Sequence, residues 1–357
     1  MLNTWRLPGA DDSAGEEIHA FLSCDFCLPP RAMPGSVPAL RRVGWRFGDL
    51  DRGPHRCPVC PPGPDDGPRL RRSPASRSPK LPDVIVIGAP KAGTTALHAY
   101  LDVHPEIAMA VDKELNFFCD PDCVDRLDEY AHFFNGDSRL CGETSPWYAI
   151  DPIVTGVPER MRAALPDVKI IYLVRDPVDR ALGEYAQYRA VWEPIPIEDA
   201  FRNLGDPHDR YTASGLYGRQ LERYLSAFPA EQVLVVDQAD LLTARQATLR
   251  GAFRFLGVED SFASPQFAPR VNTTASRRQI GDAWRRLRGT RAVGLLKRLP
   301  PRPREMVLRP ARRLLSHRPE PPPEPSPELR ARLRNTFAPD SARLRQLTGR
   351  EFASWQV

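Results

Sequence analysis

The stretch Asp83-Val-Ile-Val-Ile-Gly88-Ala-Pro-Lys-Ala-Gly-Thr-Thr-Ala-Leu97 decides the fold of this 357-residue chain. Its first half is a run of β-branched apolar residues that ends in glycine, which is typical of a buried parallel strand. A helix is predicted directly afterwards, over 94–102. The backbone N–H groups at the start of such a helix, together with the helix dipole, can bind phosphate. The stretch therefore predicts a strand, a phosphate-binding loop and a helix.

The alternation of strand and helix continues along the chain. Buried strands are predicted over 169–174 and 233–236, and helices over 177–190, 214–227 and 245–256. This order predicts an α/β fold with a P-loop-like, doubly wound parallel sheet and helices on both faces. The chain after residue 278 is predicted to be helical, with a proline-rich break over 319–327 and closing helices around 328–348.

The loop differs in one respect from the loop that binds nucleoside triphosphates, G-x-x-x-x-G-K-[ST]. Gly88 and Gly93 have the right spacing and Thr95 matches the last position, but Thr94 stands where the lysine belongs. The lysine of this loop is Lys91, two residues before the second glycine. The sequence therefore favours a smaller anion than a triphosphate.

This placement resembles the sulfotransferases that use 3′-phosphoadenosine 5′-phosphosulfate (PAPS), whose loop reads Pro-Lys-x-Gly-Thr-Thr. The chain is similar to bacterial members related to the heparan sulfate sulfotransferase branch, over roughly 82–357. The other blocks that carry the resemblance are 113–118 (Lys-Glu-Leu-Asn-Phe-Phe), 142–148 (Gly-Glu-Thr-Ser-Pro-Trp-Tyr), 172–185, 215–228 and 347–355.

The resemblance implies an enzyme that transfers the sulfuryl group of PAPS to a hydroxyl or amine. Carbohydrates, glycolipids and natural products all remain open as acceptors. It further implies that Lys91 stabilises the charge that grows on the bridging oxygen, and that Glu114 takes the acceptor's proton. The donor-binding residues that it implies are Lys91, Ala92, Gly93, Thr94, Thr95, Ala96, Arg175, Gly183, Arg277 and Arg278.

Two positions depart from the family pattern. The family usually has a serine eight residues after the arginine that binds the 3′-phosphate, where this chain has Gly183, so one hydroxyl contact is missing. Heparan-type enzymes carry a lysine after the glutamate of the middle block, where this chain has Thr144. That difference argues against a heparan-like acceptor.

The first 80 residues contain thirteen prolines and two Cys-x-x-Cys pairs, formed by Cys24, Cys27, Cys57 and Cys60. Two such pairs are the ligand set of a tetrahedral Cys₄ site. We expect a zinc-ribbon-like module over 1–60 and a Pro/Arg/Ser-rich linker over 61–81, followed by the sulfotransferase domain over 82–357. The alternatives are a rubredoxin-like iron site and a disordered extension or misplaced start with accidental cysteines. A folded module would be a candidate docking site for a carrier protein or another protein partner.

Composition excludes some classes of protein and leaves others open. No run approaches 18 apolar residues, and the acidic first twenty residues do not form a signal peptide, so a cytoplasmic enzyme without a membrane span is expected. Residues 270–313 hold fourteen Arg or Lys and two acids, which keeps nucleic-acid binding open as an alternative. That block has little aromatic interleaving, so no specific nucleic acid is expected. A P-loop kinase acting on a small metabolite is the other alternative.

If the Cys₄ module exists, zinc binding by the first 60 residues should be independent of the folding of the sulfotransferase domain. The full-length protein should contain about one zinc, because a short proline-rich segment depends on its metal for most of its stability. A variant that lacks residues 1–78 should contain none and still fold and bind nucleotide. Metal analysis and calorimetry of both proteins check this. No metal in either protein would contradict the Cys₄ site, and loss of folding on truncation would assign the front segment to the core.

Overall fold

The computed structural model describes residues 80–134, 138–191, 195–267 and 321–357. It also assigns three pairs of short strands outside these ranges: β1 (Leu2–Trp5) with β2 (His19–Leu22), β3 (Arg46–Asp49) with β4 (Gly53–Arg56), and β10 (Gln279–Ile280) with β11 (Ser316–His317). The chain divides into a unit of Ser76–Gln279 with Ser316–Val357, and a unit of Met1–Ala75 with Ile280–Leu315. The expected boundary at residue 60 lies outside the described residues and stays a prediction.

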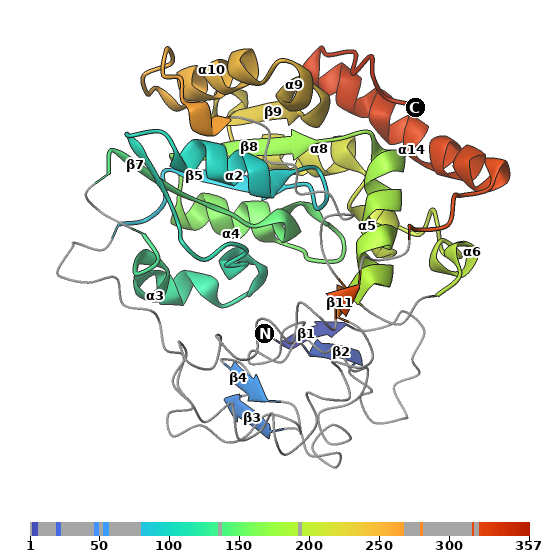
Figure 1. Cartoon of the computed structure of the whole chain (residues 1–357). Helices are drawn as coiled ribbons and strands as arrows, with labels where there is room; N and C mark the ends of the chain where they lie inside the picture. Colours follow the sequence, from blue (N-terminus) through green and yellow to red (C-terminus); the bar gives the residue numbers. More distant parts are fainter. Residues whose placement is uncertain are drawn as a thin grey trace. The chain divides into compact units, whose positions relative to one another are not determined.

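The first of these units is built on a five-stranded parallel sheet (Figure 1). Its strands, in spatial order, are β6 (Ile107–Met109), β7 (Leu140–Thr144), β5 (Val84–Gly88), β8 (Lys169–Val174) and β9 (Val233–Asp237). The strand that opens the deciding stretch, β5, lies in the middle, and all of its residues are buried. The predicted parallel α/β fold is therefore confirmed.

Helices connect and cover these strands. The longer ones are α2 (Thr94–Asp102), α4 (Val157–Ala164), α5 (Pro177–Val191), α8 (Tyr217–Ala227), α10 (Arg245–Leu256) and α14 (Pro327–Thr348). The shorter ones are α3 (Leu127–Ala131), α6 (Ile197–Ala200), α7 (Arg210–Ala213) and α9 (Gln238–Thr243), with 3₁₀ turns η1 (Phe117–Cys119), η2 (Cys123–Arg126), η3 (Pro146–Ala149), η4 (Ala230–Gln232) and η5 (Pro265–Phe267).

The strand order determines which face each helix covers. The chain leaves β5 towards β6 through α2, and later returns past β5 towards β8 through α4. Because parallel crossovers are right-handed, two crossovers that run in opposite directions place their helices on opposite faces. Consistent with this, α4 packs on α8, whereas His104 after α2 contacts Phe253 of α10, with the two rings tilted and their centroids 4.5 Å apart.

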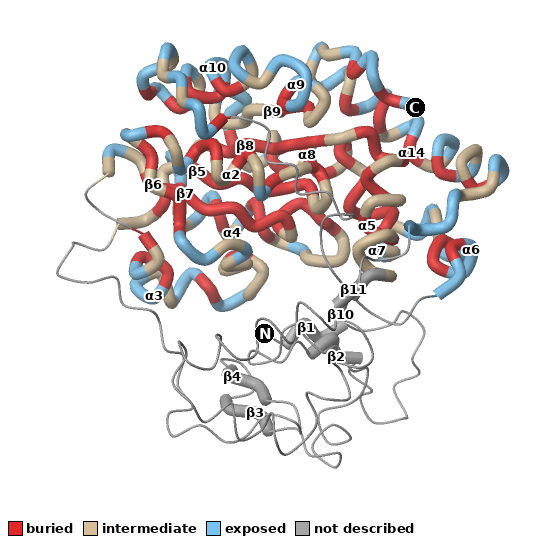
Figure 2. The backbone as a smooth tube through the Cα atoms, viewed as in Figure 1, coloured by how far each residue is buried: buried red, intermediate tan, exposed pale blue. Residues whose placement is uncertain are grey.

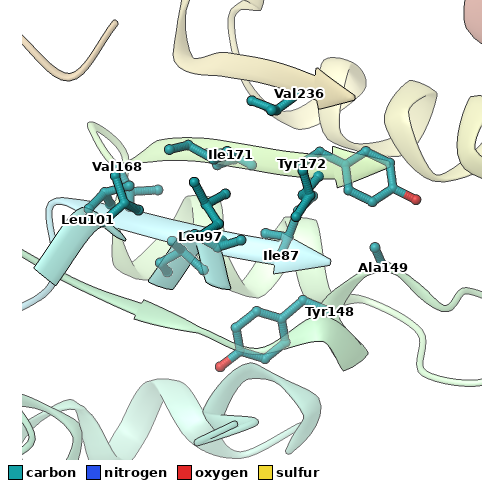
Figure 3. Packing of buried hydrophobic residues seen from close by; sticks show 14 of the residues in the cluster. Ile87, Leu97, Leu101, Tyr148, Ala149, Val168, Ile171, Tyr172 and Val236 are labelled. Atoms are coloured by element: carbon teal, nitrogen blue, oxygen red, sulfur yellow. The ribbon is translucent and has the colours of Figure 1, made fainter. Parts of the chain in front are cut away.

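The core lies between the sheet and these helices. Leu97 and Leu101 of α2 are four residues apart, so they share one helix face, and both are fully buried. They pack towards the sheet near Ile87 and Ile171 (Figure 3), and buried residues concentrate in the strands and on the inner sides of the helices (Figure 2). Full burial of each such side chain stabilises the fold by about 1.5–3 kcal/mol.

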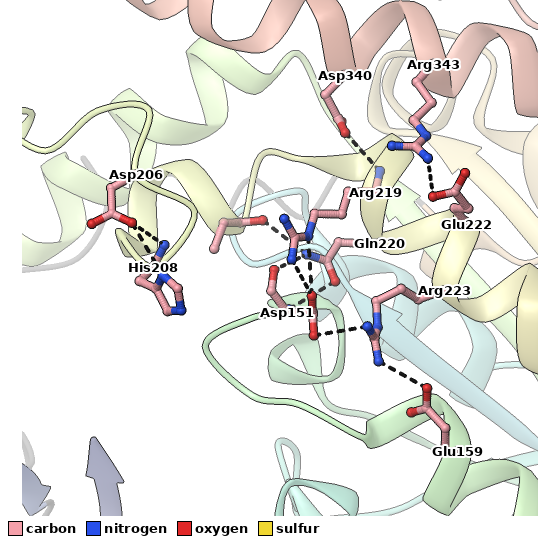
Figure 4. A network of polar contacts seen from close by, with 11 residues as sticks. Asp151, Glu159, Asp206, His208, Arg219, Gln220, Glu222, Arg223, Asp340 and Arg343 are labelled. Atoms are coloured by element: carbon pink, nitrogen blue, oxygen red, sulfur yellow. Dashed lines mark hydrogen bonds and ion pairs between the residues drawn. The ribbon is translucent and has the colours of Figure 1, made fainter. Parts of the chain in front are cut away.

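The last helix, α14, is tied to α8 by a polar contact as well as by packing. Asp340, in the middle of α14, accepts hydrogen bonds from the backbone N–H groups of Gly218 and Arg219, both 2.8 Å long. Figure 4 shows the bond to Arg219. These groups belong to the first turn of α8 and have no acceptor within their own helix. Burial raises the pKa of the Asp340 carboxyl, and the two N–H bonds oppose that rise. A residue more than 120 positions away therefore caps α8.

A second polar network fixes the other side of α8. Asp151 accepts from Arg219 at 2.9 Å and lies 3.5 Å from Arg223, which also pairs with Glu159 of α4 at 3.0 Å (Figure 4). Gln220 holds the backbone of Asp151 through its amide, at 3.0 and 2.7 Å. Helix α8 is thus held in place from α4, from the loop after η3 and from α14.

The close contact of α8 with α14 predicts that replacing two helical glycines by alanine has different effects on the free energy of unfolding. A Cβ at Gly218 would stand 2.6 Å from the backbone oxygen of Asp340, whereas a Cβ at Gly251 of α10 would meet nothing within 4 Å. Gly218→Ala should lower the free energy of unfolding by about 1–3 kcal/mol through overpacking. Gly251→Ala should leave it unchanged or raise it by up to about 1 kcal/mol. Chemical denaturation measures both, and equal effects would contradict the tight packing of α14 on α8.

Candidate active site

The candidate site lies at the carboxyl edge of the sheet, where β5 and β8 end side by side. These neighbouring parallel strands have connections that leave in opposite directions, one through α2 and the other through α5. In open α/β sheets ligands bind at such a switch point, outside the carboxyl ends of the strands. The loop that contains Lys91 follows β5, and Arg175 follows β8 directly.

The loop after β5 turns sharply into α2. Gly93 precedes the helix with φ 99°, a left-handed conformation that suits glycine, and a Cβ there would stand 3.1 Å from the side-chain nitrogen of Gln238. Lys91 is also left-handed, with φ 69°. Such conformations in non-glycine residues cluster at functional sites. The loop therefore brings the open N–H groups of the first turn of α2, at Thr94 and Thr95, to the edge of the sheet.

Arg175 connects the two loops. Its Nη1 donates a hydrogen bond of 3.3 Å to the backbone oxygen of Lys91, and its Nη2 lies 4.0 Å from Asp179. A Cβ at Gly183 of α5 would stand 3.4 Å from the same Nη1. The structure thus brings together Lys91, Arg175 and Gly183, which the resemblance implied as parts of one donor-binding site, Lys91 for the 5′-phosphosulfate and the other two at the 3′-phosphate.

Glu114 approaches from a third direction, on the segment between β6 and η1. Its backbone is left-handed, with φ 63°, and its N–H donates to the backbone oxygen of Thr144 at 2.9 Å. Asn116, with φ 50°, donates its N–H to the Ser145 hydroxyl at 3.0 Å. The last residue of β7 and the residue after it therefore hold the segment in an unusual conformation, and the Glu114 side chain stays half exposed.

Two further side chains join the site that the sequence analysis did not assign to it. Lys113 donates from Nζ to the Thr95 hydroxyl at 3.0 Å and lies 3.6 Å from Glu114 Oε1. His98, on α2, has its Nδ1 3.0 Å from the Thr144 hydroxyl. Burial first, and the nearby Lys113 cation second, lower the pKa of His98 to about 4. His98 is therefore neutral at physiological pH.

The buried carboxyl of Glu143 links the elements next to the site through hydrogen bonds. Its carboxyl accepts hydrogen bonds from the hydroxyls of Ser145, Tyr148 and Tyr130 at 2.6, 2.8 and 2.5 Å. Burial raises the pKa of Glu143, and these three hydroxyls oppose that rise. The network joins β7, η3 and α3, and so fixes the residues that hold the backbones of Glu114 and Asn116.

The C-terminal segment after α14 braces the two loops on the other side of the site. Gln356 donates its backbone N–H to Asp176, next to Arg175, and the Trp355 indole nitrogen lies 3.4 Å from Asp237, next to Gln238. Arg350 pairs with Asp240 of α9 at 2.6 Å. The loops after β8 and β9 are thus joined by residues from the end of the chain.

Other sequence predictions have different outcomes. His104, which follows α2, is buried and bonded through both ring nitrogens, to the Glu259 oxygen and the Glu106 N–H, so its role is structural. Arg277 and Arg278 lie outside the described residues, as do all four cysteines of the expected zinc site (Cys24, Cys27, Cys57 and Cys60). The described ranges contain no cluster of three or more metal-binding side chains, and none of their helices is long and apolar enough to cross a membrane.

Comparison with known proteins defines the class to which this site belongs. The family model described as "Sulfotransferase domain" matches residues 81–273. This covers more than half of the chain, which therefore belongs to the sulfotransferase family. The resemblance inferred from the sequence blocks is confirmed.

The individual relatives include enzymes of heparan sulfate modification. Human bifunctional heparan sulfate N-deacetylase/N-sulfotransferase 2 is 30% identical over 199 residues, which is 50% of this chain and 22% of that protein. Human heparan sulfate glucosamine 3-O-sulfotransferase 3B1 is 32% identical over 200 residues, 54% of this chain and 50% of that one. The chain thus spans about half or less of these relatives. A sulfotransferase from Alicyclobacillus acidocaldarius superposes with a TM-score of 0.56 at 27% identity, covering 78% of this chain and all of that one.

The neutral state of His98 predicts a pH dependence of stability. Its pKa is about 4 in the folded protein and ordinarily 6.5, so the unfolded chain binds the additional proton between these values. The free energy of unfolding should therefore fall as pH is lowered from 6.5 to 4, by at most about 3 kcal/mol from this residue. His98→Gln should reduce that fall, whereas the exposed His132 changed to Gln should not. Urea denaturation at several pH values measures it, and identical pH profiles for wild type and His98→Gln would contradict the assignment.

Proposed function

We propose that this protein transfers the sulfuryl group of PAPS to a hydroxyl or amine of a carbohydrate. The observation that carries the proposal is the convergence of three separate segments at one edge of the sheet. These are the loop with Lys91, the arginine after β8, and the segment with Glu114. Family membership supports the transferase chemistry, and the positions of these residues support the choice of donor.

Each end of the donor has a matching group in this arrangement. The loop of residues 91–96 and the first turn of α2 would hold the 5′-phosphosulfate through backbone N–H groups and the Lys91 ammonium. Arg175 would bind the 3′-phosphate, with Arg277 and Arg278 as further cations. Gly183 supplies no hydroxyl there, so this phosphate depends more heavily on Arg175. The absence of a lysine after Gly93 disfavours a nucleoside triphosphate and hence a kinase.

The reaction follows from where charge and protons must go. The bond between sulfur and the bridging oxygen of the 5′-phosphate breaks, and a bond forms between sulfur and the acceptor oxygen or nitrogen. The bonding electrons remain on the phosphate of the product 3′-phosphoadenosine 5′-phosphate (PAP), where Lys91 would stabilise the added negative charge. Glu114 would accept the acceptor's proton, and its half-exposed carboxylate can reach an acceptor that arrives from solvent.

The choice of a carbohydrate rests on the relatives, two of which are named for heparan sulfate and for its glucosamine. Thr144 marks a difference from them, because heparan-type enzymes are expected to have a lysine there. In this chain Thr144 is fully buried and its hydroxyl lies beside His98. We therefore propose a glycan acceptor that need not be heparan itself.

The experiment that tests this proposal compares PAP with ATP by calorimetry. PAP should bind, and ATP should bind about tenfold or more weakly, since ATP has no 3′-phosphate for Arg175. Arg175→Ala should weaken PAP binding by a similar factor. Glu114→Gln should leave PAP affinity within about twofold but lower the release of PAP from PAPS, with a glycan panel as acceptors, on the order of 10²-fold or more.

Arg254→Ala is the matched control, because Arg254 forms a surface ion pair with Asp260 through a largely exposed side chain. It should leave both binding and turnover unchanged. Equal affinity for PAP and ATP would overturn the choice of donor. Full activity of Glu114→Gln would move the base elsewhere, with Asp112 the nearest candidate.

A further inference from the structure

Lys113 occupies an unusual place for a lysine. Its side chain is only 19% exposed, and its ammonium contacts the hydroxyl of Thr95, in the first turn of α2, as well as the carboxylate of Glu114. Lysine side chains are rarely buried, because the ammonium is strongly hydrated in water. This one therefore adopts a restricted position between the anion-binding loop and the carboxylate of the proposed base.

The electrostatics of that position favour an anion. A helix N-terminus carries about half a positive charge, so a cation beside it is repelled unless negative charge compensates. Here the Lys113 ammonium lies at the start of α2, and Arg175 contacts the loop that precedes this helix. Nearby His98 is held neutral, partly by Lys113 itself. Glu114 beside Lys113 and Asp179 beside Arg175 supply negative charge among these groups, and a bound anion would further balance the positive end of α2.

We propose that Lys113 is a second catalytic cation, which donates a hydrogen bond to an oxygen of the sulfuryl group during transfer and orients Glu114 at the same time. This inference rests on the proposed function. Lys91 lies in the loop that would hold the 5′-phosphate, whereas Lys113 reaches the same loop from the segment that carries the base. Lys113 thus lies between the loop and the acceptor side, where the sulfuryl group must pass.

The role predicts a specific difference between two nucleotides. PAPS carries the sulfuryl group and PAP does not, so only PAPS can bind to Lys113 in this way. Lys113→Met should weaken PAPS binding by about ten- to hundredfold, the usual loss for a hydrogen bond to a charged group, and leave PAP within about twofold. Turnover should fall by about 10²–10³-fold, and Lys113→Arg should recover part of the loss because it keeps the charge.

The test measures binding of PAPS and PAP to the wild type and the variants by calorimetry, which requires no acceptor, together with PAP release from PAPS. Lys80→Met is the control, because Lys80 is also partly buried and paired with a carboxylate, that of Asp83, at the other end of the strands. It should behave as wild type. Unfolding midpoints of all variants identify any that lose their fold, and Lys113→Gln then replaces Lys113→Met.

The outcomes separate the two proposals. If wild type binds neither nucleotide, the proposed function fails. If wild type binds both and Lys113→Met weakens PAP as strongly as PAPS, Lys113 belongs to the phosphate site and the inference is overturned. If turnover falls while the ratio of PAPS to PAP affinity stays at the wild-type value, Lys113 acts only on Glu114, and the sulfuryl contact is overturned as well.

Discussion

The burial of strand β5 is the constraint on which the rest of the structure depends. It pairs with β7 on one side and β8 on the other, and helices pack over it, so its backbone groups are satisfied within the sheet. The anion-binding loop follows its carboxyl end directly. The loop that follows is therefore anchored at a fixed point and continues into a helix whose inner face is itself buried. A rigid strand and helix thus set the position of an irregular loop between them.

The site combines backbone conformations that are individually unfavourable. Lys91, Glu114 and Asn116 all have positive φ, and each such residue costs free energy that its surroundings must offset. Hydrogen bonds supply this offset. Arg175 donates to the Lys91 carbonyl, the Glu114 N–H donates to the Thr144 carbonyl, and the Asn116 N–H donates to the Ser145 hydroxyl. The groups that would bind and react are thereby ordered before any ligand arrives, which lowers the entropy cost of binding.

Much of the fold could be predicted from the sequence, because it depends on local patterns. The β-branched runs of β5, β8 and β9 and the periodicity of α2, α5 and α10 appear almost where they were expected. The short strands β6 and β7 and helix α4 were missed, since their few apolar residues resemble ordinary loop sequence and their pairing is decided by distant neighbours. The predicted helix 214–227 begins only at Tyr217, where the cap from Asp340 is available, and no local signal reveals that cap.

The candidate site was predicted less completely for the same reason. Lys91, Glu114 and Arg175 belong to recognisable blocks, whereas Gln238 and His98 join the site only through tertiary packing. Lys113 could have been noticed, because it is one of only five lysines in an arginine-rich chain and precedes the proposed base. Its partner Thr95, however, is eighteen residues away in the sequence, and the two come into contact only in the folded domain.

The cap that Asp340 provides to α8 affects how such domains can be exchanged between proteins. The family model ends at residue 273, yet α14 and the residues after it supply the cap, part of the core and the braces at Asp176 and Asp237. A gene fusion or domain swap that carried only the matched region would leave α8 uncapped and its apolar contacts exposed to water. Recombination during evolution, or in a chimeric enzyme, must therefore transfer the closing helix together with the sheet. The unit of inheritance is longer in sequence than the region by which the family is recognised.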